Sequence, residues 1–96
     1  MTSLPAQPLS PLDGRYRAAV APLADYLSEA GLNRARVEVE VEWLLALTGR
    51  SLFGTSPLSD DQQTQLRALY RDFGQAEIDW LAEKEAVTRH DVKAVE

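Results

Sequence analysis

The one histidine of this chain stands between an arginine and an aspartate, in the segment Arg89-His90-Asp91 near the C-terminus. An imidazole can act as an acid, a base or a hydrogen-bond donor near neutral pH. Residues 91–96 are predicted to begin a helix, because Asp91 would place a negative charge at the positive end of the helix dipole. From residue types alone, a solvated histidine at a helix N-terminus is favoured over a functional one.

A second group of reactive side chains lies near the other end, in the segment Asp13-Gly14-Arg15-Tyr16. A guanidinium binds phosphate or carboxylate through two hydrogen bonds, and a phenol adds a hydroxyl donor. Asp-Gly is a turn signal, so these side chains are predicted to project from a loop. The alternative is a turn whose Arg15 and Tyr16 only pack against each other, and spacing alone favours it.

Other kinds of site are excluded or weakly supported. One histidine without a second ligand at metal spacing cannot build a metal site, and the chain has no cysteine, no Gly-rich phosphate loop and no nucleophile motif. Glu38, Glu40 and Glu42 are interpreted as a solvated or intersubunit salt-bridge face. Trp43 and Trp80 are interpreted as anchors of a core or an interface.

Composition limits the class of protein and its partners. The 96 residues correspond to one small domain with a formal net charge of −5. This acidic balance, without a basic run, disfavours nucleic acid and anionic membranes as partners. No apolar run approaches the roughly 20 residues of a membrane helix, and no secretory signal is recognised at the N-terminus. The absence of cysteine suits a reducing compartment, so a cytoplasmic location is predicted.

The elements that position these segments are predicted to be helices. Residues 1–12 contain three prolines and are predicted to form an extended arm, followed by a helical domain over 13–96. A first helix is expected from about Ala21 to Ala30, with Pro22 in its first turn and Gly31 as its C-cap.

Residues 32–48 carry two competing patterns. Valines at 37, 39 and 41 alternate with glutamates, as in a strand with one charged face. The same segment has apolar residues at helical spacing, and 17 unbroken residues are long for a strand but normal for a helix. We therefore predict a helix. Because it is apolar around most of its circumference, it is expected to be largely buried, for example against other subunits.

Two further helices and the start of another complete the prediction. A loop is expected over 49–57, and the sequence from Ser59 to Gln62 is typical of a capping box. The helix that follows should stop at Gly74, and another should span about 75–87. The fold class is therefore all-α, with about four helices and the start of a fifth. That last helix would have fewer than two turns, so the chain is expected to be truncated at its C-terminus.

Helices joined by short loops run antiparallel. Four helices would therefore return the chain to the end where it began. On this basis, the loop containing Arg15 and the segment containing His90 are expected to face a common cleft. Arg15 and Arg89 would make that cleft positive in an otherwise acidic domain.

Three segments together resemble the N-terminal region of the adenylosuccinate lyase family, in that family's order and approximate separations. They are residues 10–16 (SPLDGRY), 36–44 (RVEVEVEWL) and 88–96 (TRHDVKAVE). The resemblance implies the N-terminal helical domain of the fumarase/aspartase superfamily, which is all-helical and homotetrameric. It implies active sites shared between subunits, no cofactor and no metal. The implied substrate is adenylosuccinate, or the succinylated carboxamide ribotide of purine synthesis, from which fumarate is eliminated.

The resemblance also implies roles for individual residues. Arg15 and Tyr16 would bind the substrate near its phosphate, and Arg89, His90 and Asp91 would line the same site, with His90 donating a hydrogen bond. The family's catalytic serine and general-acid histidine would lie beyond residue 96, so the chain alone is expected to be inactive. The main alternative is a non-catalytic helical interaction module. A third is another superfamily lyase, such as an argininosuccinate-type enzyme, but the DGRY and HDVKAVE strings argue against it.

Overall fold

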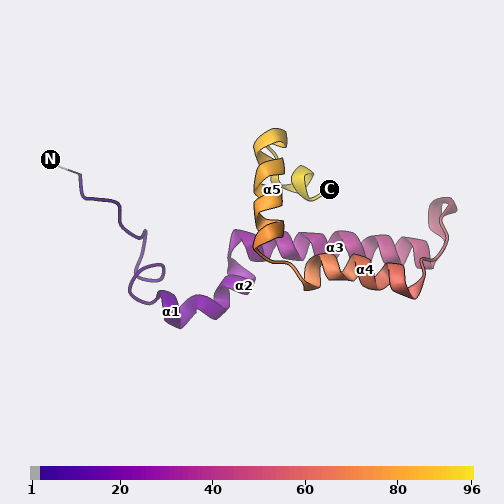
Figure 1. Ribbon diagram of the computed structural model, residues 1–96, viewed down its shortest axis with the longest axis horizontal. Coiled ribbons are helices and arrows are strands. Elements are labelled where there is room, and N and C mark those ends of the chain that lie inside the picture. The colour runs from indigo at the N-terminus through magenta and orange to yellow at the C-terminus, as the bar shows by residue number, and fades with distance from the viewer. Residues whose placement is uncertain (1–2) are drawn as a thin grey trace.

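All regular structure between residues 3 and 96, the part of the chain that the computed structural model describes, is helical. The all-α prediction is thereby confirmed; Met1 and Thr2, at the tip of the expected arm, lie outside the described residues. Figure 1 shows the elements in order. They are α1 (Arg17–Val20), η1 (Ala21–Leu23), α2 (Ala24–Leu27), α3 (Glu29–Gly49), η2 (Leu52–Gly54), α4 (Asp60–Arg71), α5 (Gln75–Thr88) and α6 (Asp91–Val95).

The first predicted helix is broken, and Gly31 does not cap it. Pro22 lies at the start of the 3-10 turn η1, where its missing N–H and bulky ring disfavour a continuous α-helix. Ser28 then adopts an extended backbone, with φ −78° and ψ 163°, and its hydroxyl accepts a hydrogen bond from the N–H of Gly31 at 3.0 Å. Ser28 is therefore an N-cap, and Gly31 belongs to the first turn of α3.

Residues 32–48 are helical throughout as part of α3, so the helix prediction is confirmed over the strand pattern. Within the described chain this helix is only partly buried, and its burial against other subunits stays a prediction. Only Gly31, Val41 and Thr48 of α3 are buried, while Val39 and Trp43 are 66% and 62% exposed. A chain with this few helices has too little surface to cover every side of α3.

Helix α4 begins where the sequence predicted a capping box. The Ser59 hydroxyl accepts from the N–H of Gln62 at 3.2 Å, and the Gln62 side chain accepts from the N–H of Ser59 at 3.0 Å, which completes the predicted capping box. Helix α4 then runs back along α3, and the two lie side by side (Figure 1). Helix α5 turns away from this pair, and α6 folds back to contact both α5 and α3.

The described chain is elongated, with extents of 65 × 31 × 19 Å, and its apolar core is small. The buried apolar side chains are Val41, Leu81 and Ala94. The segment before α2 extends away from the other helices (Figure 1). None of the helices within residues 3–96 is long and apolar enough to cross a membrane. The division into an arm over 1–12 and a helical domain over 13–96 stays a prediction.

Candidate functional site

The turn between α5 and α6 places His90. Helix α5 ends where Arg89 adopts the left-handed conformation, with φ 55°, and the N–H of Arg89 donates to the carbonyl of Glu85 at 2.7 Å. The Thr88 hydroxyl donates to the carbonyl of His90 at 3.0 Å and accepts from its N–H at 3.3 Å. These bonds reverse the chain within two residues, so that α6 begins at Asp91 and packs against α3.

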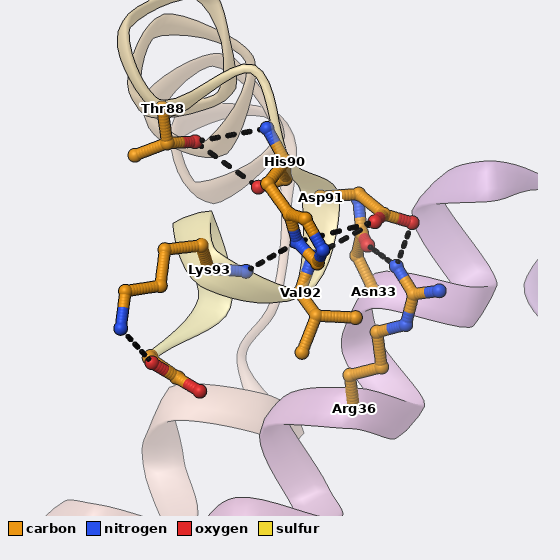
Figure 2. Close-up of polar contacts among 8 residues, drawn as sticks. Asn33, Arg36, Thr88, His90, Asp91, Val92 and Lys93 are labelled. Atoms are coloured by element: carbon orange, nitrogen blue, oxygen red, sulfur yellow. Dashed lines mark hydrogen bonds and ion pairs between the residues drawn. The ribbon is translucent and has the colours of Figure 1, made fainter.

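His90 is the N-cap of α6. Its Nδ1 atom accepts a hydrogen bond from the backbone N–H of Lys93 at 3.3 Å (Figure 2). An atom that accepts cannot carry the proton, so this network assigns the proton of the neutral ring to Nε2. The side chain is 64% exposed. Within residues 3–96 no protein group is hydrogen-bonded to Nε2, and this N–H is therefore available to a ligand.

Asp91 is bound on both of its carboxylate oxygens. Oδ2 accepts from Nη1 of Arg36 at 2.7 Å, and Oδ1 accepts from the N–H of Val92 at 2.9 Å. The Arg36 guanidinium, followed by the Val92 N–H, lowers the pKa of Asp91 below its usual range. The contact of Oδ1 with Nδ1 of His90 is 3.9 Å, too long for a hydrogen bond. Asp91 is therefore a paired anion, with one protein hydrogen bond on each carboxylate oxygen.

Arg36, which sequence reasoning did not single out as a site residue, connects this turn to α3. Its Nη1 atom also donates to the side-chain oxygen of Asn33 at 3.2 Å, one helical turn earlier (Figure 2). The pairing of Asn33 with Arg36 at i, i+3 spacing is readable from sequence once the helix is accepted. The pairing with Asp91, 55 residues away, has no sequence signal.

A small cavity of about 70 Å³ lies behind the turn, between α3, α5 and α6. Its charged lining is mainly acidic: Glu29, Glu85 and Asp91 outnumber Arg36. Neither Arg89 nor His90 lines it. This cavity is therefore poorly suited to an anionic ligand, and the exposed face of His90 is the better candidate.

Arg15 and Tyr16 lie on the extended N-terminal segment. The Asp13 carboxylate closes the preceding turn by accepting from the N–H of Ser10 at 2.7 Å and of Leu9 at 3.1 Å. These bonds, that from Ser10 first, lower the pKa of Asp13. The Arg15 guanidinium stacks over the Tyr16 ring, 5.6 Å from its centroid. The local packing that spacing favoured is therefore present, and both side chains stay exposed.

The two predicted halves of the site do not meet within one chain. Figure 1 shows α1 on the far side of α2 from α5 and α6, and Arg15 and Tyr16 line none of the cavities described here. The expectation of a common cleft within the chain is wrong. It assumed that every helix runs antiparallel to its neighbour, whereas the N-terminal segment extends outward and α5 leaves the α3–α4 pair.

A separate polar cluster joins α3 to α4. Glu42 accepts from Nε and Nη2 of Arg67 at 2.8 and 3.2 Å and from the Tyr70 hydroxyl at 2.6 Å. Hydrogen bonds from Arg67 and then Tyr70 lower the pKa of Glu42 to about 2. The interpretation of the three glutamates as a solvated or intersubunit face is therefore wrong for Glu42, which pairs within the chain.

Trp43 and Trp80 are more than half exposed, so neither is a core anchor among the described residues. No group of three or more His, Asp or Glu side chains within residues 3–96 is arranged to hold a metal ion.

Comparison with known proteins gives one consistent result. The chain is 43% identical over 89 residues to adenylosuccinate lyase of Haemophilus influenzae. The aligned region covers 92% of this chain and 20% of that protein. The chain is 37% identical over 92 residues to the Dictyostelium discoideum adenylosuccinate lyase, covering 92% of the chain and 19% of the relative. The adenylosuccinate lyase of Legionella pneumophila (strain Corby) is 35% identical over 97 residues, covering 100% of the chain and 21% of the relative. No family model matches the chain.

These matches confirm the resemblance that the three sequence segments indicated. The chain spans about one fifth of the length of the curated relatives that it matches.

Proposed function

From the relationship of this chain to the adenylosuccinate lyases, we propose that it supplies substrate-binding residues to an enzyme that eliminates fumarate from adenylosuccinate. The identity of 43% over 89 residues is the observation that carries this proposal. The same enzyme would act on the succinylated carboxamide ribotide of purine synthesis. By resemblance it would be a cytoplasmic homotetramer that needs no cofactor.

The reaction defines what the chain must provide. A base removes a proton from the carbon beside one carboxylate, the C–N bond to the purine amine breaks, and the departing nitrogen gains a proton. Negative charge builds up in the transition state of a substrate that already carries a phosphate and two carboxylates. Hydrogen-bond donors and cations fixed in advance stabilise such charge.

His90 has the geometry of a donor to this substrate. Its Nδ1 accepts from the N–H of Lys93, so its exposed Nε2–H can donate outward. The adjacent Arg89 is exposed and adds positive charge on the same turn. Because Arg36 pairs with Asp91, an anionic substrate near His90 would not face an unpaired carboxylate.

Arg15 and Tyr16 would bind the substrate phosphate from the extended N-terminal segment. Because this segment lies apart from α6 in Figure 1, we propose that the two halves of one site come from different subunits of an oligomer. This arrangement agrees with the shared active sites that the resemblance implies. The base and the general acid would come from other parts of the enzyme, since the single histidine of this chain is assigned to binding.

The test is fumarate release from adenylosuccinate by the protein that carries this chain. Wild type should turn over, and Arg15→Gln and His90→Gln should each lower kcat/KM by about 10²–10⁴-fold, as loss of a charge-stabilising donor does. Arg67→Gln, which breaks an ion pair on the α3–α4 side, is the matched control and should retain activity. A wild-type protein that releases no fumarate would overturn the proposal.

A non-catalytic helical interaction module is the second candidate, and the exposed apolar surface favours it. A groove of about 450 Å³ between α3, α4, α5 and α6 is lined mainly by apolar side chains, including Leu69, Phe73 and Trp80. This candidate predicts that the wild-type protein releases no fumarate. The same fumarate assay therefore distinguishes the two candidates.

A further inference from the structure

We infer that Arg36 on α3 is a positioning residue that holds the His90–Asp91 turn in the orientation that presents Nε2 of His90 to substrate. The inference rests on the proposed function, because it concerns the same site. Arg36 does not touch the substrate in this account; it acts through Asp91.

Helix α6 cannot hold its own orientation. It has five residues, and helices this short are not stable in isolation. What fixes it to the rest of the chain is the burial of Ala94, the two hydrogen bonds between Thr88 and His90, and the Arg36–Asp91 ion pair at 2.7 Å. At the end of α6 where His90 is located, the Thr88 bonds join the turn to the adjacent end of α5, whereas the ion pair joins it to α3.

Arg36 is itself held in place. It lies within the 21-residue helix α3, and Asn33 accepts a hydrogen bond from the same Nη1 atom that binds Asp91. Its side chain is only 27% exposed. The guanidinium is attached to α3 through its own side chain and is held there by Asn33, so it is a rigid support for the turn.

The restraint on Asp91 reaches the His90 imidazole through the backbone. Asp91 is bonded to His90 through one peptide group, so holding the Asp91 side chain restrains the backbone from which the imidazole extends. That restraint keeps Nδ1 in reach of the Lys93 N–H, and this hydrogen bond leaves the proton on Nε2 (Figure 2). Releasing Asp91 would free the ring to rotate and to exchange its proton between the two nitrogens.

The kinetic test is a double-mutant cycle in the fumarate assay with the protein that carries this chain. Arg36→Gln should lower kcat/KM by about 10²-fold, the size expected when a group is misplaced by about 1 Å. Arg36→Lys should recover part of the loss, since an ammonium can still pair with Asp91. In the Asp91→Asn background, Arg36→Gln should have no further effect, because both changes break one interaction. Additive losses would overturn the inference.

Arg67→Gln is the matched control, because it breaks an arginine–carboxylate pair on the same helix away from His90. Equal losses in Arg36→Gln and Arg67→Gln would show a general effect on folding and would also overturn the inference.

A second readout does not depend on activity and separates the inference from the proposed function. Because His90 is the only histidine, the ¹⁵N-labelled chain gives one set of imidazole signals. Above pH of about 8, where an ordinary histidine is neutral, wild type and Arg67→Gln should show Nε2 protonated and Nδ1 not. Arg36→Gln should shift both signals toward an average of the two tautomers. Unchanged signals in Arg36→Gln would refute the positioning role, whereas absence of lyase activity from the wild-type protein that carries this chain would refute only the proposed function.

Discussion

At the scale of single residues, the hydrogen-bond partners of each side chain decide its role more than its type does. His90 and Asp91 are neighbours, yet one leaves a donor facing outward and the other has both oxygens occupied by Arg36 and Val92. The sequence predicted that His90 lies at a helix start and that Asp91 is in the first turn. It could not predict the contact with Arg36, because that contact depends on how α6 docks on α3.

Glu42 provides the clearest pH-dependent prediction. Its pKa is about 2 in the folded chain, against an ordinary value of 4.5, so it stabilises the fold fully above pH of about 4.5. This stabilisation is lost as pH falls from about 4.5 toward 2, when the carboxylate is protonated. Glu42→Gln should therefore be less stable than wild type at pH 7, and the difference should shrink across that window.

The measurement is urea denaturation followed by circular dichroism at several pH values. Glu40→Gln is the matched control, because it removes the same charge from the exposed side of α3. It should show no comparable loss at pH 7. A Glu42→Gln deficit that is constant from pH 7 to pH 2 would contradict the assigned role.

At the scale of elements, segment length and capping residues predicted most of the helices. The exception is the break before α3, which depends on close packing at Gly31. The unbroken stretch over 32–48 outweighed its alternating valines and glutamates, and Ser59 with Gln62 marked the start of α4. The break before α3 was missed because Gly31 resembles a C-cap, while Ser28 beside Glu29 is an equally good helix start. A Cβ at Gly31 would lie 2.5 Å from the carbonyl oxygen of Asp25. Such tertiary contacts are not visible in sequence.

Gly31→Ala is accordingly predicted to destabilise the chain by about 1–3 kcal/mol, the usual cost of overpacking. Gly49→Ala is the matched control at the other end of α3, where an added Cβ meets nothing within 4 Å. It should be neutral or stabilising by up to about 1 kcal/mol, because alanine favours helix. Urea midpoints measure both effects, and equal midpoints for the two variants would refute the close-packing role of Gly31.

At the scale of the whole molecule, the apolar surface exceeds what the described helices cover. Val39 and Trp43 are exposed along α3, and the groove beside Trp80 is open. An apolar surface of this kind usually marks an interface. The sequence predicted that α3 is apolar around most of its circumference. It could not indicate which sides stay uncovered, because that depends on where α4 and α6 pack.

We therefore predict that the chain self-associates with increasing concentration. Static light scattering should give a weight-average mass that rises above 10.7 kDa. Trp43→Gln should reduce this rise, because it removes apolar area from α3. Leu9→Gln, on the extended arm, removes an even more exposed apolar side chain and should leave the association unchanged. A constant monomer mass across the concentration range would contradict the prediction.

The central claim is that Arg15 and His90 bind one substrate from two different subunits, and subunit mixing tests it most directly. Arg15→Gln and His90→Gln variants of the protein that carries this chain are each expected to release fumarate near background. When the two are refolded together, some mixed sites combine an intact Arg15 from one subunit with an intact His90 from another, so part of the wild-type activity should return. If the mixture stays at the sum of the two separate variants, the two residues do not complete a site across subunits, and the account is contradicted.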